Sequence, residues 1–407
     1  MKQNLAILLC IIVFWGCSSP WDAQPAKITP HNSAVDKFVV ASDNSFGFRL
    51  FSQVNMNERN NNVFISPFSV SMAFGMVLNG ANGTTLDSLE QSLGDAGLSL
   101  EEINNSYKNI SSTLANLDAS VVFQNANSIW YKTGFSVLQE FINDNKTYFD
   151  ADVTSLNFSQ PSAVSTINNW VNVKTDGKIP TILEKIPSDA VMYLINAIYF
   201  KGTWTNLFDP KKTSSAPFTC SDGSIASCSL MYQRVTFAYY ADSNMQAIDL
   251  PYGNKSFSMT VILPNSGTSI DQFAEGLTQD QWNTITGNMD SSKVDLYIPK
   301  FTIEFGKSLN NELKALGMNI AFSKKHANFT RVNPMGGLYI DSVEHKTFLK
   351  VDEEGTEAAA VTSIGHGING GPFFPLMRID HPFILAIREH QSGTILFIGK
   401  IANPSAQ

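Results

Sequence analysis

The chain has 407 residues, enough for two or three average domains or for one large domain with a sizeable core. Its 36 acidic and 28 basic residues give a net charge of −8 without a basic run, so nucleic acid is not expected as a partner. With 28 phenylalanines the sequence is too apolar for disorder, and no repeat of 20 to 50 residues recurs.

The N-terminus is predicted to direct export. A basic start is followed by an apolar run over residues 5–15, which is too short for a comfortable membrane span. The run ends in Gly-Cys-Ser-Ser at residues 16–19, which resembles the bacterial lipoprotein box. Residues 1–17 are therefore interpreted as a signal peptide whose Cys17 is lipidated, and residues 18–32 as a flexible tether. The residue after the Cys is not acidic, which implies the outer membrane or cell surface. Because two bulky aromatic residues precede the box, ordinary secretion with cleavage nearby is the alternative.

The folded region is expected to begin near Asn32. Apolar residues over 38–51 have helical spacing, and a short buried strand at 62–65 leads through Ser66-Pro67 into an apolar helix. Further along, the sequence predicts a loop at 79–85 followed by a helix, a strand at 121–131, part of a helix at 141–149, and a helix at 167–179 ended by Gly177.

The second half of the chain is predicted to be rich in strands. Residues 192–204 are almost continuously apolar, as in a strand buried on both faces, and Asn196 within it must find hydrogen-bond partners. Other strands are predicted at 245–252, 257–263, 294–305, 381–388 and 394–400, with a helix at 308–316 that stops at Gly317.

Two cysteines lie outside the leader. Asp222-Gly223 between Cys220 and Cys228 predicts a hairpin turn with one Cys on each strand. A disulfide is plausible in an oxidising compartment, and two buried free thiols are the alternative, because the Cα separation cannot be read from sequence. No metal or cofactor is expected, since there is no Cys-x-x-Cys and the histidines are scattered.

Motifs typical of enzymes are weak. Residues 365–370 satisfy G-x-G-x-x-G, but Pro372 and Pro375 follow, so no helix can open there and a dinucleotide site is rejected. No G-x-S-x-G, H-E-x-x-H or P-loop occurs. A hydrolase with a Ser/His/Asp triad stays open as an alternative, because triads are spatial.

An unusual segment follows the extended run at residues 347–351. It is small and flexible, as an exposed loop must be, yet every second residue from Thr356 to Ile364 is small or apolar and could face a core in a strand. An ordinary exposed loop is the alternative. The segment comprises Glu353, Glu354, Gly355, Thr356, Glu357, Ala358, Ala359 and Ala360.

These eight residues resemble the proximal hinge of the serpins, the serine protease inhibitor family. The resemblance covers roughly residues 33–404 and includes the terminal pair of strands, and the chain as a whole resembles a bacterial lipoprotein-type serpin. It implies a single α+β domain over residues 33–404 with three β-sheets, about nine helices and an exposed reactive-centre loop at about residues 353–380.

The resemblance also implies site residues. Ser66, Ser69, Asn196 and His345 match the family's shutter, a hydrogen-bonded cluster that governs opening of the main sheet. Trp204 matches the breach, the point where the loop enters the sheet. The alternative is that these are satisfied core groups without a switching role.

In this family the target protease attacks one peptide bond of the loop, which we call the bait. Counting Gly355 as the fifteenth residue before that bond places the bait at Asn369–Gly370, with Ile368 and Gly371 as alternates. The implied function is suicide-substrate inhibition of serine or cysteine proteases by a monomer that is not itself an enzyme. No Lys or Arg lies at the bait, which argues against trypsin-like targets. A non-inhibitory serpin that binds a ligand or client protein is the rival hypothesis.

Overall fold

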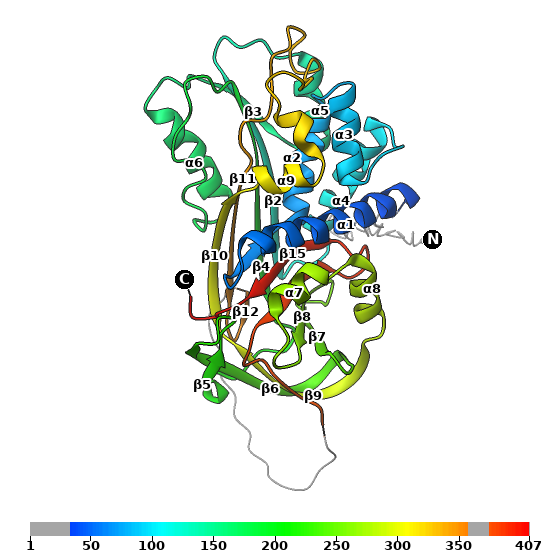
Figure 1. The fold of residues 1–407 in the computed structure, drawn as a ribbon, viewed down its shortest axis with the longest axis vertical. Coiled ribbons are helices and arrows are strands. Elements are labelled where there is room, and N and C mark those ends of the chain that lie inside the picture. The colour runs from blue at the N-terminus through cyan, green and yellow to red at the C-terminus, as the bar shows by residue number, and fades with distance from the viewer. Residues whose placement is uncertain (1–32, 357–373, 407) are drawn as a thin grey trace, which may run out of the picture. The chain divides into compact units, whose positions relative to one another are not determined.

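The computed structural model describes residues 33–356 and 374–406, which belong to one compact unit. Within them the chain forms nine α-helices and three β-sheets, as predicted (Figure 1). The leader with Cys17, hinge residues 357–360 and bait residues 368–371 lie outside the described residues.

Five of the nine helices of the described chain, α1, α2, α4, α7 and α8, begin at a Ser or Thr whose side chain accepts a hydrogen bond from a free amide of the first turn. The Ser33 side chain accepts a hydrogen bond from the Asp36 amide and forms a capping box at the start of α1. The Ser66 side chain caps α2 by accepting a hydrogen bond from the Ser69 amide, and Pro67 lies in the first turn of that helix. The helices are α1 (Ala34–Asn57), α2 (Pro67–Leu78), α3 (Thr84–Leu93), α4 (Leu100–Asn116), α5 (Gln139–Phe149), α6 (Ser162–Lys174), α7 (Ile270–Gly276), α8 (Gln279–Gly287) and α9 (Asn310–Ala315), with 3₁₀ turns η1 (Pro210–Lys212) and η2 (Met318–Phe322).

The largest sheet has nine strands in the order β1-β15-β14-β8-β7-β6-β9-β13, with β5 paired to β6. Strands β15 and β14 follow β1 near one edge of this sheet and are almost wholly buried, and they are the terminal pair that the sequence predicts. The bounds are β1 (Val63–Ile65), β5 (Ser214–Thr219), β6 (Ile225–Ala241), β7 (Met245–Tyr252), β8 (Phe257–Pro264), β9 (Asp290–Pro299), β13 (Leu376–Arg378), β14 (Phe383–Glu389) and β15 (Ile395–Ile401).

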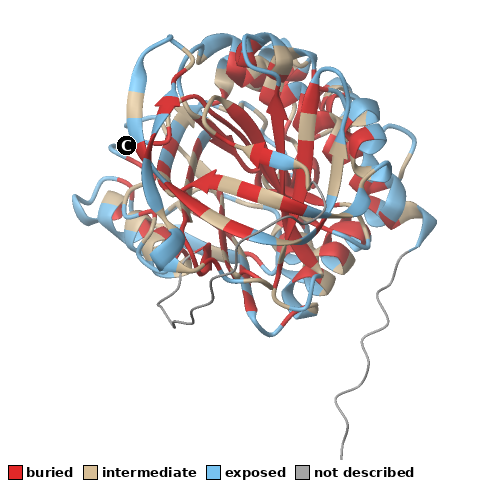
Figure 2. Cartoon of the chain, turned by 90° about the horizontal axis from the view of Figure 1, so that it is seen from below, coloured by how far each residue is buried: buried red, intermediate tan, exposed pale blue. Residues whose placement is uncertain are grey.

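Two smaller sheets hold the strands that matter for function. One has the order β12 (Gly355–Thr356), β4 (Met192–Thr203), β2 (Val121–Lys132) and β3 (Asp152–Leu156); the other pairs β10 (Phe301–Ser308) with β11 (Glu344–Val351). No ladder joins β4 to β11 in the part of the chain that is described. Helix α2 packs on β4 from the core side, and Ile167 and Val171 of α6 pack with Ile195 and Ala197 from the other side. Figure 2 shows buried strands inside and exposed helix faces outside.

The single strand predicted at 294–305 is wrong. Strand β9 ends at Pro299 in the nine-stranded sheet, and β10 begins at Phe301 in the two-stranded sheet. Pro299 cannot donate to a ladder, and the Lys300 amide donates to the Ser229 carbonyl at 2.8 Å, so the chain changes sheets at this point.

The candidate disulfide is also wrong. The predicted hairpin is present, but Cys220 and Cys228 are free, buried thiols. Cys228 lies opposite Ala216, whereas the Cys220 amide bonds the Ser224 carbonyl. The register therefore separates the two cysteines by four residues along the hairpin, about 13 Å at the usual rise per residue, well beyond disulfide reach.

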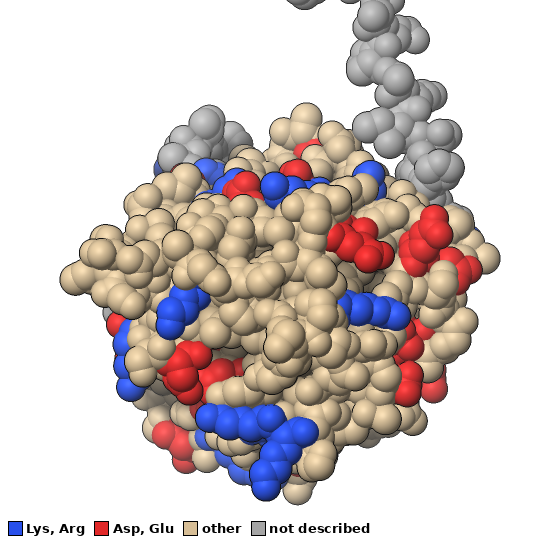
Figure 3. All heavy atoms as spheres, turned by 90° about the horizontal axis from the view of Figure 1, so that it is seen from above, with Lys and Arg blue, Asp and Glu red and all other residues tan. Residues whose placement is uncertain are grey.

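The face of the molecule drawn in Figure 3 carries no large basic region. On the face in Figure 3, charged side chains of both signs stand on a mostly uncharged surface, with one small basic group at its edge. No helix of the described chain is long and apolar enough to cross a membrane.

Candidate functional site: the hinge and the sheet seam

The first hinge residues are already part of a sheet. Gly355 and Thr356 pair antiparallel with Thr203 and Gly202 at the end of β4. Glu353, Glu354 and Thr356 are each less than a tenth exposed. The predicted loop bounds are therefore wrong at both ends: the chain is buried up to Thr356, and residues 376–378 form β13, because backbone pairing with β4 and β9 holds both ends.

Gly355 is required by a close backbone approach. A Cβ atom there would lie 2.0 Å from the Gly202 carbonyl oxygen and 2.8 Å from the Thr203 Cα atom. Its φ of 156° is also unusual for residues with side chains. The adjacent Gly202 leaves room for the Tyr252 ring, since a Cβ there would lie 2.8 Å from that ring.

Thr356 is held by an aromatic stack. Its hydroxyl and the Tyr252 hydroxyl are 2.7 Å apart, and the Tyr252 ring stacks on Trp204 with centroids 4.4 Å apart. Trp204 in turn donates from Nε1 to the Asp352 carbonyl and from its amide to the Glu354 carbonyl, at 2.9 and 2.8 Å. The predicted breach residue thus contacts the hinge directly.

Glu353 anchors the turn before the hinge. Lys300 Nζ lies 2.7 Å from one carboxylate oxygen, and the Thr213 hydroxyl donates to the other at 2.8 Å. Burial alone opposes ionisation of Glu353, but the bonds from Lys300 and Thr213 outweigh it and lower its pKa. The Phe208 amide also donates to the Glu353 carbonyl at 2.9 Å.

The four predicted shutter residues lie together beneath the seam between β4 and β11. The Ser66 amide donates to Nε2 of His345 at 3.1 Å, the Ser69 amide donates to the Ser66 hydroxyl, and the Ser69 hydroxyl donates to Asn196. Burial lowers the pKa of His345 to about 4, so its ring is neutral near pH 7 and can accept that bond. Ser66 also donates to the Leu396 carbonyl at 2.6 Å.

Sequence reasoning missed three members of this site. Asn196 donates to both Asn125 and Asn127 of β2, and Tyr252 meets Thr356. For Asn125 and Asn127, the sequence did offer a signal, because two asparagines at alternate positions of a buried strand must find hydrogen-bond partners. For Tyr252, only the arrangement of β7 under the hinge reveals the role.

A cavity of about 300 Å³ lies at the opposite end of the seam from the hinge, beside the first residues of β4. Residues 192–196 of β4 form one wall, residues 336–345 the opposite wall, and α2 the floor. Ser69, Asn196 and His345 line it together with apolar side chains. Among the described residues, no group of three or more His, Cys, Asp or Glu could hold a metal ion.

Comparison with known proteins gives the class to which this chain belongs. The family model described as Serpin (serine protease inhibitor) matches residues 41–404, and the chain belongs to this family. It is 33% identical to human Serpin B11 over 88% of this chain and 97% of that protein. It is 32% identical to human leukocyte elastase inhibitor over 89% of this chain and 99% of that protein.

Solved structures agree with this assignment. The native state of the thermophilic serpin tengpin is similar with a TM-score of 0.83 and 33% identity, over 90% of this chain and 94% of tengpin. Human thyroxine-binding globulin, solved with its hormone, is similar with a TM-score of 0.82 and 27% identity, over 92% of this chain and all of that one.

Proposed function

We propose that the protein is a suicide-substrate inhibitor that traps serine proteases as covalent acyl complexes, with cysteine proteases as a second target class. One observation carries the proposal: Gly355 and Thr356 already pair with the end of β4, and no ladder joins β4 to β11 among the described residues, so an arm that continued this pairing would lie between these two strands. Membership of the serpin family and the similarity to leukocyte elastase inhibitor support inhibition over catalysis.

The chemistry begins at the bait. The nucleophile of the protease attacks the carbonyl carbon of Asn369, the bond to the nitrogen of Gly370 breaks, and Gly370 leaves as a free amine with the proton. The fourteen-residue arm up to Asn369, roughly 46 Å long at the rise of a strand, then inserts with the protease attached. If insertion is faster than deacylation, backbone pairing deforms the protease and the acyl bond persists.

The existing register sets where each arm residue would go. Because Thr356 pairs with Gly202, each further residue pairs one position earlier on β4, so Gly355 to His366 would cover β4 down to Met192. Thr356 and Gly202 face Tyr252, hence Ala358, Ala360 and the later even-numbered residues would also face the core. His366 would be buried and neutral, at some cost.

The two flanks of the seam give consistent registers. Along β4, Thr362 would pair with Asn196. On the other flank, the Asp352 amide donates a hydrogen bond to the Gly355 carbonyl. If this antiparallel pairing continued along β11, each further residue of the arm would lie opposite the preceding residue of β11, and Thr362 would lie opposite His345. Insertion would therefore introduce a small polar residue between the two shutter residues, which would hydrogen-bond a short side chain and exclude a long one.

A protease panel tests this proposal. Elastase-like, subtilisin-like, asparagine-cleaving and papain-like enzymes are mixed with the purified protein, and denaturing gels are examined for a covalent band. Mass spectrometry of the released C-terminal peptide identifies the bond, which we expect after Asn369, with Ile368, Gly370 and Gly371 as alternates. The Thr356→Arg protein should instead be cleaved as a substrate, because its cation would have to enter the buried site beside Tyr252. A stable covalent band with Thr356→Arg would contradict the mechanism.

A non-inhibitory serpin that binds a ligand or client is the second candidate, favoured by the similarity to thyroxine-binding globulin. Heating separates the two. Cleavage of the loop should raise the melting temperature sharply if the arm inserts, whereas an unchanged melting temperature would favour the binding protein.

Export completes the proposal. We propose that the inhibitor is exported and tethered through Cys17 to the outer membrane or cell surface, with secretion as the alternative; the apolar leader and its lipoprotein-like box support this.

A further inference from the structure

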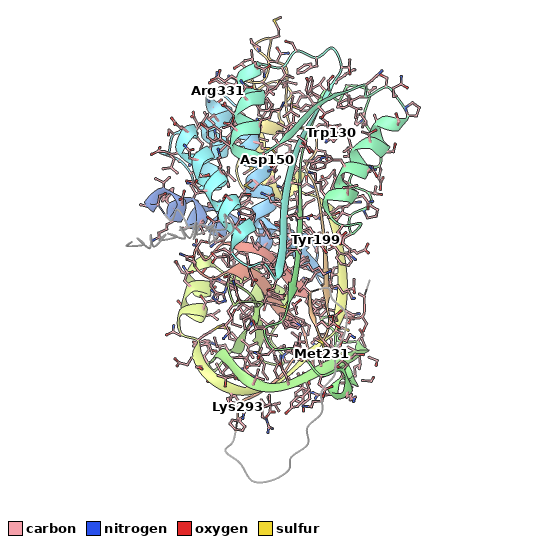
Figure 4. All side chains as sticks on the ribbon, turned by 180° about the vertical axis from the view of Figure 1, so that it is seen from behind. Trp130, Asp150, Tyr199, Met231, Lys293 and Arg331 are labelled. Carbon is pink, nitrogen blue, oxygen red and sulfur yellow. The ribbon has the colours of Figure 1, made fainter. Side chains whose placement is uncertain are left out.

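One exposed sheet face carries cations and aromatic rings in alternation. On β6, β9 and β13, residues such as Met231, Leu296 and Met377 point into the core, and their neighbours point outward. We call the outward set, together with Lys212 of η1 and Phe374 just before β13, the basic-aromatic face. Its cations are Lys212, Arg234, Lys293 and Arg378, and its rings are Tyr232, Tyr297 and Phe374. Figure 4 shows Met231 and Lys293 at the same end of the molecule.

Each cation lies over a ring. Lys212 is 5.9 Å from the centroid of Tyr232, and Arg378 is 5.2 Å from that of Tyr297. Arg234 and Lys293 lie 5.4 and 5.1 Å from Phe374. The rings hold the cations in place at the surface, so less side-chain entropy would be lost when a partner binds.

The charge of this face is opposite to that of the chain. Four cations stand with two acids, a local charge of +2, whereas the whole chain carries −8. Arg234 holds Asp295 through two bonds of 2.6 and 2.8 Å, and Arg378 lies 3.1 Å from Asp380. Lys212 and Lys293, both exposed, form no ion pair with any described residue, so their charges remain available to a partner.

The position of the face determines which partner can reach it. Phe374 lies five residues after Asn369, a span of at most roughly 17 Å. A protease domain of about 220 residues has a radius of gyration of about 17 Å. A protease bound at the bait is therefore large enough and close enough to reach β13 and β9.

We propose that the basic-aromatic face is a docking surface for the acidic surface of the target protease beside its cleft. This inference rests on the proposed function and specifies which proteases it would favour, namely those with an acidic surface beside the cleft. Carboxylates of the protease would pair with Lys212 and Lys293, while Phe374 and Leu376, which is 55% exposed, supply apolar contact. The face would mainly accelerate association, since charges at the rim of an interface act on the encounter rate.

The test uses subtilisin whose catalytic serine is replaced by alanine, so that binding is measured without cleavage or trapping. Its lysines are either acetylated, which removes their charge, or succinylated, which makes them acidic. At about 50 mM salt we expect the succinylated form to associate about tenfold faster than the acetylated form, and at about 300 mM salt the difference should largely vanish. The double variant Lys212→Glu, Lys293→Glu should abolish the difference at low salt.

A matched control separates this face from net charge. Lys146→Glu with Lys325→Glu changes the net charge equally at exposed positions, on α5 and after η2, and should keep the difference. Three results would overturn the docking surface. The two subtilisin forms could associate at equal rates, or the succinylated form could show no detectable binding. Alternatively, both double variants could lose the rate difference between the two forms equally. Absence of a covalent band with active subtilisin would reject the trapping mechanism alone, because the serine-to-alanine enzyme reports docking independently.

Discussion

Two carboxyl groups are buried among the helices without a cation beside them. Asp43 of α1 is 3% exposed and Asp95, after α3, is 0% exposed. The Tyr107 hydroxyl donates to Asp43 at 2.9 Å, but the other Asp43 oxygen and both Asp95 oxygens have no partner in the described structure. Burial, and secondarily Asp95, raises the pKa of Asp43; burial and Glu90 raise the pKa of Asp95 to about 7. The fold thus favours protonated acids here.

This predicts an unusual pH dependence of stability. The folded chain keeps protons on these acids that the unfolded chain releases above about pH 4. The stability that the protonated acids contribute is therefore complete below about pH 4 and is lost as the pH rises through about 7. Asp95→Asn, which resembles the protonated acid, should flatten the fall in melting temperature between about pH 5 and about pH 8. The same substitution should also raise the free energy of unfolding by about a few kcal/mol near pH 8.

Thermal melts across that range are the measurement. Asp280→Asn, which removes an exposed acid on α8, is the control and should retain the slope of the unchanged protein. A slope that Asp95→Asn leaves unaltered would show that this carboxyl is ionised in the fold.

At the scale of elements, the inserted arm can be tested with two neighbouring alanines. The register places Ala358 toward the core opposite Phe200, and Ala359 on the other face. Ala358→Arg should raise the number of inhibitor molecules consumed per trapped protease at least severalfold, because a buried cation stalls insertion. Ala359→Arg should change this ratio much less. The ratio is obtained by titrating protease activity, and equal effects of the two variants would disprove the register.

Sequence reasoning identified most elements and most of the seam. The strand at residues 245–252 matches β7, and the apolar pattern of residues 192–204 reveals β4, because burial leaves a strong trace in composition. Ser66, Ser69, Asn196 and His345 followed from the resemblance. The partner of Asn127, the contact of Tyr252 and the separation of Cys220 from Cys228 depend on register between distant strands, which local patterns do not encode. The break between β9 and β10 is different, because Pro299 marks it in the sequence.

At the scale of the whole molecule, attachment to a membrane is a separate prediction. Expressed with its leader in a Gram-negative host, the protein should incorporate labelled palmitate and partition into detergent. Cys17→Ala should remove the label, since the lipid is expected on that sulfur. Secretion of an unlabelled native protein would favour the alternative of ordinary export. The inhibitory reaction should be the same in both forms, because residues 18–32 are interpreted as a tether.

The pairing of Gly355 and Thr356 with β4 before any cleavage has a kinetic consequence. Strand formation usually begins with an unfavourable nucleus, in which chain entropy is lost before contacts form. Here the nucleus already exists in the intact protein, so insertion is an elongation that starts from a formed hairpin. Its speed should depend on how fast β4 and β11 separate, and only weakly on how long the segment beyond Thr356 is.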